Sequence, residues 1–433
     1  MPDALDVHSV AILHKLGLTE DMVRDHVLHP HEADAAAQLE LHEAGDVTDV
    51  IEPPPSGLLY ELDVEGLRRD LHALLSPCLA GYALQLRRHG RVMIDDHAGP
   101  ARTHDDGDVA WGPGVKMHVA SASKLITAMA MTKVLHSRNI SPNATIARWL
   151  PAHWVRGPGV DRLTFRQLLT HTSGLVALDE PGRADYQFMK DEIARGVVGG
   201  TGYRNINYSL CRILISTIDA PFLFDLLPTV NDNYWDLTTI RHYRDYVQEN
   251  VFDPVGVASA FTHATDHALA YPFPVNAPGQ ATGDLSTMSG AVGWHLSVDD
   301  LLAIMAAFRR LGTIVDPARA QTMLDLGFGL DTIPDRDTLL GRIYTKGGFW
   351  SFPRDKVNGV FVQQTNAFFL PKGMELVILA NSPLCHPDTG FRDRVLEAIR
   401  ANIHLRLATI AVTAVAAFAL AGLVRQVRAP GRP

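Results

Sequence analysis

The stretch VASASKLITAMAMTKVL, residues 119–135, places a lysine in the first turn of a long apolar run. Such a run predicts a buried helix. Residues three apart share one helix face, so Ser121 and Lys124 are expected to be neighbours. Burial and the positive end of the helix both disfavour an ammonium at this place. Two interpretations follow: a serine cap with a stray charge, or a serine nucleophile beside a neutral amine that accepts its proton.

Three later segments favour the second interpretation. LTFRQLLTHTSGL covers residues 163–175, GYRNINYSL covers 202–210, and YTKGGFW covers 344–350. Together with the serine–lysine pair, their order and spacing resemble the class C-like branch of the serine β-lactamase and penicillin-binding-protein-like superfamily. That branch also includes esterases and D-aminopeptidases, and the resemblance extends over residues 57–404.

The resemblance implies a chemical role for four side chains. Ser121 matches the acylated nucleophile, and Lys124 matches its proton partner. Tyr203 matches the general base or its relay, with a phenol pKa lowered by the ammonium groups of Lys124 and Lys346. No metal and no cofactor is implied, because the amine and the phenol supply the activation.

The same resemblance implies the groups that hold the substrate. Asn205 matches a donor to the acyl-side carbonyl. The backbone N–H groups of Ser121 and Phe349, the latter following Gly348, match the oxyanion hole. His171, in the HTSGL turn, is expected to have a structural, hydrogen-bonded role.

Three positions depart from the pattern of the family. Gly347 lacks the hydroxyl that helps β-lactamases hold the substrate carboxylate. Arg204 stands where a small residue is more usual. Phe349 and Trp350 are bulky, and we expect them to make the rim of the site apolar. These differences weaken the expectation of penicillin recognition and leave acyl transfer itself intact.

The leading functional hypothesis is a serine hydrolase that forms an acyl-enzyme on Ser121, an esterase or amidase acting on small-molecule acyl substrates. One alternative is a D,D-peptidase or β-lactamase acting on cell-wall-like or β-lactam substrates. Another is a catalytically silent sensor or scaffold with the same fold. The presence of Ser121, Lys124, Tyr203 and Lys346 together argues against a silent protein.

The patterning predicts an α+β fold with an antiparallel sheet flanked by helices. VEGLRRDLHALLSP and GFRDRVLEAIRANIH have helical periodicity, near the two ends of the resemblance. GYALQLRRHGRVMIDD predicts two strands around His89-Gly90, and VFVQQTNAFFLP with MELVILANS predicts two more around residues 371–373. Residues 125–285 are expected to form a large, mostly helical insertion into this β-lactamase/transpeptidase-like sheet.

The flanking segments and the charge balance add further expectations. Residues 1–56 form a polar extension that ends in the proline-rich EPPPSG; its histidines fit no common metal-ligand spacing, and no cleavable signal peptide opens it. Within residues 405–433, the uncharged run Leu407 to Val424 is flanked by arginines, and membrane association through this helix is set against a cytoplasmic protein with a packed terminal helix. The net charge of −9 makes nucleic acid an unlikely partner. Three distant cysteines leave one disulfide possible.

Overall fold

The computed structural model describes residues 60–175, 185–221, 224, 232–258, 261–333, 336–352, 359–385 and 390–405, which belong to one structural unit. The extension before residue 57 and the apolar run Leu407 to Val424 lie outside the described residues, so the expectations about them stay predictions. Within the described ranges, no helix is both long and apolar enough to cross a membrane.

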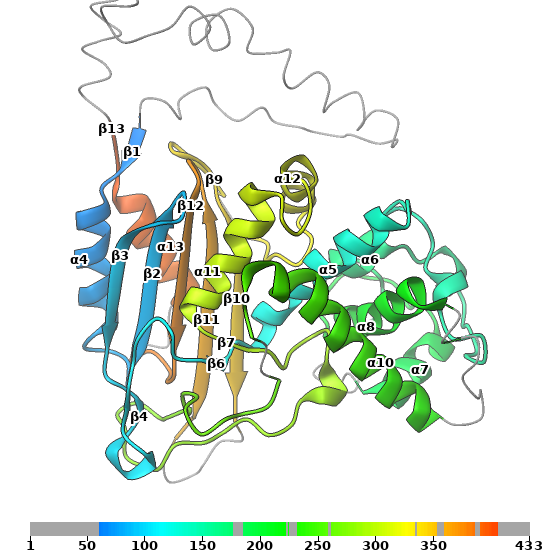
Figure 1. Ribbon diagram of the computed structural model, residues 1–433, viewed down its shortest axis with the longest axis horizontal. Helices are drawn as coiled ribbons and strands as arrows, with labels where there is room; N and C mark the ends of the chain where they lie inside the picture. The colour runs from blue at the N-terminus through cyan, green and yellow to red at the C-terminus, as the bar shows by residue number, and fades with distance from the viewer. Residues whose placement is uncertain are drawn as a thin grey trace, which may run out of the picture. The chain divides into compact units, whose positions relative to one another are not determined.

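A five-stranded antiparallel sheet in the order β10-β11-β12-β2-β3 forms the centre of the fold (Figure 1). Its strands are β2 (Tyr82–Arg88), β3 (Arg91–Ala98), β10 (Tyr344–Ser351), β11 (Val362–Leu370) and β12 (Met374–Ala380). The two predicted hairpins are confirmed. The β2–β3 turn uses His89 and Gly90 at φ of 50° and 81°, the positive values that a tight hairpin turn requires.

The chain order explains why the sheet is interrupted. The first two strands pair with the last three, since β2 lies directly beside β12. The segment between β3 and β10 is therefore an insertion between the β2–β3 hairpin and the strands β10–β12, which lie side by side in one sheet. The predicted α+β class and its large insertion are confirmed.

Short two-stranded sheets, separate from the central one, pair further segments of the described chain. They join β1 (Tyr60–Leu62) to β13 (Ile403–Leu405), β4 (Pro100–Arg102) to β5 (Val109–Ala110), β6 (Met117–His118) to β7 (His295–Leu296), and β8 (Asp337–Thr338) to β9 (Gly341–Arg342). The β1–β13 pair sets Tyr60 opposite Leu405, so the two ends of the described body lie together.

Helices cover both faces of the sheet (Figure 1). α4 (Val64–Leu75) and α13 (Phe391–Ala401) lie on one face, and α11 (Val298–Ala306) lies on the other. The other helices belong to the insertion: α5 (Ser123–Ser137), α6 (Phe165–Leu169), α7 (Tyr186–Arg195), α8 (Ile206–Asp219), α10 (Asp232–Val247) and α12 (Pro317–Asp325). On β12, Leu376 and Ile378 face the α4–α13 side, whereas Val377 and Leu379 face the side of α5, α8 and α11. This alternation builds two separate cores from one strand.

The insertion is helical over a shorter stretch than predicted. Within the predicted range, residues 125–285, the helical turns end at Val255, and the described residues 261–285 contain no helical turn. Prolines and glycines concentrated in residues 272–283 explain the difference, because they interrupt backbone hydrogen bonding.

The helix α5 lies at the centre of the molecule. Eleven of its residues are buried, and they surround the helix. A helix that is apolar all round must be enclosed by protein, and α8 and α11 pack in the same core. The sequence run that begins with the serine–lysine pair is thus confirmed as a buried helix.

The three cysteines are divided into one pair and one thiol. Cys78 and Cys385 form a disulfide across 307 residues of sequence. Cys211 is a buried free thiol on α8, and burial raises its pKa.

Candidate active site

Ser121 and Lys124 lie side by side where α5 begins. Ser121 stands in a single 3₁₀ turn, Ala120–Ala122, and Lys124 is fully buried in the first turn of α5. The Lys124 Nζ lies 3.1 Å from Ser121 Oγ, and it donates to Asn205 Oδ1 at 2.8 Å and to the Ala291 carbonyl at 3.0 Å. Burial first, and then the charge of Lys346, lower the pKa of Lys124.

The alternative of a serine cap is wrong. The residue at the cap position of α5 is Ala122, and no side chain caps this end. Ser123, the other serine of the motif, is fully buried, and its Oγ accepts the Trp294 N–H at 3.3 Å. Ser121 therefore remains as the half-buried hydroxyl beside the amine.

Tyr203 closes the group from the segment before α8. Its hydroxyl lies 3.3 Å from the Lys346 Nζ, and the Lys124 Nζ lies 5.0 Å from its ring centroid. Although 45% of the residue is exposed, its hydroxyl end is enclosed by Ser121 and the two lysines. Burial alone raises the pKa of the phenol, but the two ammonium groups and hydrogen bonds from Ser121 and Lys124 outweigh it and hold the pKa below its usual value.

The ring of His171 packs against the ring of Tyr203. Their ring centroids are 4.3 Å apart. The His171 Nδ1 accepts the Arg204 N–H at 3.3 Å and lies 3.1 Å from Asn207 Nδ2. Burial, followed by the charges of Lys124 and Lys346, lowers the pKa of His171 to about 3, so the ring is neutral. This is the hydrogen-bonded, structural position expected for the HTSGL turn.

Asp331 belongs to this site, and sequence reasoning missed it. Its carboxylate accepts from Lys346 Nζ at 2.5 Å, from the Gly347 N–H at 2.7 Å and from Arg392 at 3.3 Å. Burial raises the pKa of Asp331, but Lys346 and the other donors outweigh it and lower the pKa overall. The available signal was a single acid after the apolar, glycine-rich LGFGL, which fits no motif.

Lys346 differs from Lys124 in the direction of its pKa shift, because Asp331 contacts Lys346. Both lysines are buried, and burial alone lowers the pKa of each. For Lys346, the negative charges of Tyr203 and Asp331 reverse this effect and raise the pKa above the usual value. The site thus contains one amine shifted toward its neutral form and one stabilised as a cation.

The strand β10 presents its outer edge to the turn that carries Ser121. It is the outermost strand of the sheet, and it packs against the turn Ala120–Ala122. A Cβ on Gly348 would lie 2.2 Å from the Val119 carbonyl oxygen, so this approach requires glycine. The Gly347 N–H points away from β11 toward Asp331, and alternation aims the Phe349 N–H to the same edge.

The sequence matches the profile of the family described as Beta-lactamase over residues 71–394, which is most of the chain. The chain belongs to the β-lactamase family. Members of this family are serine hydrolases, and the arrangement around Ser121 is built on their fold. No curated protein matches the chain.

Solved structures share the fold at low sequence identity. EstCE1, a hydrolase with promiscuous acyltransferase activity, has a TM-score of 0.55 and 16% identity, covering 78% of this chain and 97% of its own. A class C β-lactamase from Rhodobacter sphaeroides has a TM-score of 0.53 and 18% identity, covering 77% and 98%. The D-amino acid amidase from Ochrobactrum anthropi has a TM-score of 0.51 and 19% identity, covering 78% and 97%.

The rim of this β-lactamase-family site differs from the expectation. Phe349 and Trp350 leave β10 on opposite faces, because successive side chains of a strand alternate. Gly348 faces the nucleophile turn, so Phe349, which is 59% exposed, points away from it. Trp350 is on the nucleophile side, where it packs edge-on against His118 at 5.2 Å. The expectation that both residues form an apolar rim is therefore wrong for Phe349.

Proposed function

We propose that this protein is a serine hydrolase that forms an acyl-enzyme on Ser121 and acts on small esters or amides. The observation that carries the proposal is the 3.1 Å contact between Ser121 Oγ and the buried Lys124 Nζ, whose pKa is lowered. A hydroxyl becomes a competent nucleophile when a neighbouring base can take its proton.

The hydrogen bonds of Lys124 define the direction of that proton transfer. Asn205 Oδ1 and the Ala291 carbonyl can only accept, so a neutral amine uses its two N–H groups on them. Its lone pair then points to Ser121 Oγ. In the first step Oγ bonds to the substrate carbonyl carbon, while its proton passes to Lys124 or to the Tyr203 phenolate.

The remaining steps use the same groups in reverse. The proton taken from Ser121 is delivered to the leaving alcohol or amine as the bond between it and the acyl carbon breaks. A water molecule then attacks the acyl-enzyme, giving its proton to Tyr203, and the Ser121 oxygen recovers a proton as the acid departs. The N–H groups of Ser121 and Phe349 would hold the oxyanion in both halves, as positioned donors do.

The environment of Lys346 supports small neutral substrates over β-lactams or D-alanyl peptides. These carry a carboxylate, which needs a cation and a hydroxyl on this strand. Here Asp331 already neutralises Lys346 and takes the Gly347 N–H, and Gly347 has no hydroxyl. A hydrogen bond to a charged group contributes about 1.5–3 kcal/mol, or roughly ten- to a hundredfold in rate. EstCE1 and the amidase show that the fold accommodates such chemistry in other proteins.

Labelling with a fluorophosphonate probe tests the nucleophile. We expect mass spectrometry of digested protein to place one adduct on Ser121, and Ser121→Ala to lose both the adduct and all turnover while keeping its folding transition. Ser123→Ala is the matched control, because Ser123 is enclosed and bonded to Trp294. An adduct on Ser123 would refute the assignment, and no adduct at all would favour the silent scaffold.

A substrate comparison tests the preference. We expect kcat/KM for a p-nitrophenyl short-chain ester to exceed that for a chromogenic cephalosporin by at least about 10². Gly347→Thr should narrow this gap by restoring a hydroxyl. A wild-type preference for the cephalosporin would replace the esterase proposal with the β-lactamase alternative and leave the chemistry of Ser121 unchanged.

A further inference from the structure

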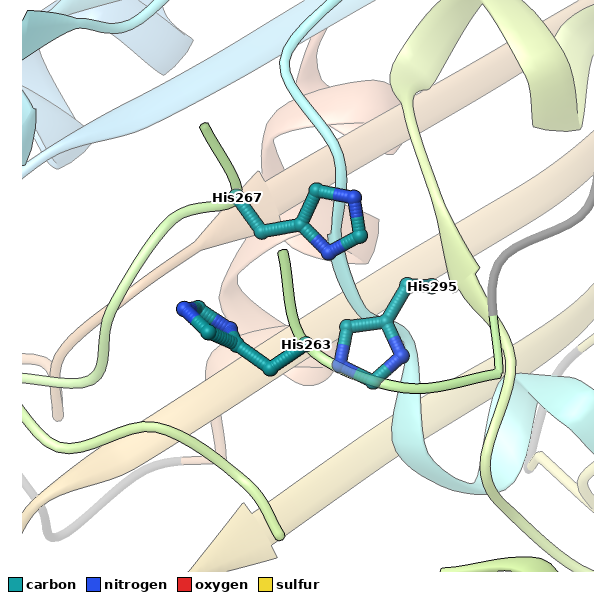
Figure 2. Close-up of side chains that lie close together, drawn as sticks. All are labelled: His263, His267 and His295. Atoms are coloured by element: carbon teal, nitrogen blue, oxygen red, sulfur yellow. The ribbon is translucent and has the colours of Figure 1, made fainter. Parts of the chain in front are cut away.

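Three histidines form a cluster outside the candidate active site (Figure 2). His263 and His267 come from the irregular segment after residue 260, and His295 comes from β7. One ring nitrogen from each lies within 4.8 Å of the others. His267 and His295 are 4% and 1% exposed, and His263 is half-buried. Imidazole is the commonest metal ligand in proteins, so three imidazoles enclosed together form a candidate metal site.

The hydrogen bonds orient the ring of His295 for this purpose. Its Nδ1 lies 3.2 Å from the Gly293 carbonyl, which can only accept, so the ring proton is on Nδ1. Its Nε2 then carries a lone pair, which faces the Thr282 hydroxyl at 3.0 Å. An imidazole that donates one N–H to a backbone carbonyl and offers the other nitrogen is the usual arrangement of a metal-ligating histidine.

The other two rings also have nitrogens to offer. The Nδ1 of His267 accepts the Ala264 N–H at 3.2 Å, so a metal bound through this nitrogen would displace that N–H. The Nδ1 of His263 is buried and has no hydrogen-bond partner among the described residues. A buried polar atom without a partner costs about 1–3 kcal/mol and calls for an explanation.

Two neighbouring cations border the cluster, since after burial the charges of Lys116 and Arg102 both lower the pKa of His267. Arg102 lies 3.4 Å from the Nε2 of His263 and can only donate, so without a metal the ring proton is on Nδ1, and it must leave Nδ1 for a metal to bind there. Arg102 also donates to the Asp106 carbonyl at 2.8 Å and to the His267 carbonyl at 3.2 Å, so other acceptors hold it in place. The guanidinium therefore borders the cluster without occupying its centre.

We propose that His263, His267 and His295 bind one divalent transition-metal ion of the zinc class. Calcium and magnesium prefer oxygen ligands, whereas a set of three imidazoles suits zinc and its neighbours. Nitrogens at the usual bond length of 2.0–2.1 Å in a tetrahedral site lie about 3.3 Å apart, so the rings close slightly around the ion. The fourth position would be filled by water.

The ion would stabilise the segment that carries Ser121 while lying outside the candidate active site. His295 lies opposite His118 in the β6–β7 pair, and the next residue, Val119, donates its N–H to the Trp294 carbonyl at 2.9 Å. Ser121 follows two residues later. A metal that ties the segment around His263 and His267 to β7 would therefore stabilise this region without touching the substrate.

Metal titration of the full-length protein, after removal of bound metal, tests the proposal. We expect one Zn²⁺ or Co²⁺ per chain by calorimetry, a higher thermal midpoint, and the visible absorption bands of tetrahedral Co²⁺. His263→Ala should weaken binding by at least about tenfold. His263 is half-buried, so this variant is expected to fold, and His295→Gln provides a second, more buried variant.

The matched control is His242→Ala, a half-buried histidine that pairs with Asp219 on another part of the body. It should leave binding unchanged. The sequence has other histidines near its start, and binding to them would survive the His263→Ala and His295→Gln variants. Absence of stoichiometric binding, or binding that survives both His263→Ala and His295→Gln unchanged, would overturn the proposal. Either result is independent of ester hydrolysis and leaves the proposed function standing.

Discussion

At the residue scale, two buried lysines in one site have opposite pKa shifts. Lys124 is surrounded by an amide oxygen, a carbonyl and a hydroxyl, which do not compensate for burial. Lys346 instead contacts the Asp331 carboxylate, whose negative charge compensates for burial. Because its pKa is raised, Lys346 is stabilised as the cation that helps to hold the pKa of Tyr203 down.

Removal of the Lys346 charge should move the pH profile of the enzyme. The active form requires a deprotonated base, so kcat/KM rises with pH through the pKa of Tyr203, which Lys346 lowers. Lys346→Met removes that cation, so the rising limb should shift to higher pH and kcat at neutral pH should fall by about 10² or more. The measurement is kcat/KM for an ester against pH.

Tyr203→Phe is the companion variant for this prediction. It should lower kcat by about 10² or more, with a smaller change in KM, and it should remove the limb that Lys346→Met displaces. A limb that stays in place in both variants would identify another residue as the base.

The sequence predicted which residues gather around Ser121 better than it predicted what controls them. Four of these residues lie in motifs whose spacing can be read from the sequence: Ser121, Lys124, Tyr203 and Lys346. The structure brings all four together. Asp331 acts only through contacts with Lys346 and the distant Arg392. Such a residue has no local pattern, so only the folded chain reveals it.

At the element scale, the approach of β10 to the turn Ala120–Ala122 depends on the absence of a side chain at Gly348. Gly348→Ala would place its Cβ 2.2 Å from the Val119 carbonyl oxygen and 3.1 Å from the Ala122 nitrogen. These are backbone atoms, so the strand must move away from the turn and take the Phe349 N–H with it.

We expect Gly348→Ala to lower kcat by about 10² or more, the effect of losing one oxyanion donor, and to destabilise the fold by about 1–3 kcal/mol through overpacking. Steady-state kinetics and urea unfolding measure the two effects. Gly283→Ala is the control, since a Cβ there meets nothing within 4 Å and no positive φ is involved. Full activity of Gly348→Ala would show that Phe349 does not form the oxyanion hole.

Elements with a clear period were predictable, and short ones were not. The β2–β3 and β11–β12 hairpins follow from alternation around turn residues, and α4 and α13 follow from helical spacing. The pairs β1–β13 and β6–β7 contain two or three residues each, too few to show a period. They form because distant segments meet, and the histidine cluster depends on one of them.

At the scale of the whole molecule, the disulfide joins the two ends of the sheet's sequence. Cys78 lies just before β2, and Cys385 lies after β12, so the bond closes a loop that contains the whole insertion. A disulfide that closes a loop of this length restricts the conformations of the unfolded chain more than those of the folded chain.

Reduction should therefore lower the free energy of unfolding by about 2–5 kcal/mol. Thermal or urea unfolding with and without dithiothreitol measures this loss. Cys78→Ser should show the lower stability in both conditions and no response to the reductant, whereas Cys211 is a buried free thiol that plays no part. An identical response of wild type and variant would show that the bond does not form.

The β1–β13 pair brings together the first and last residues that the structure describes, which gives this body the topology of a nearly closed ring. Tyr60 lies opposite Leu405, so a linker of only a few residues would join them without crossing the molecule. The ring could then be opened at another exposed turn, such as His89-Gly90 between β2 and β3. Such a circular permutant keeps every strand neighbour while moving both ends of the chain to a new place, because chain order can change where spatial order does not.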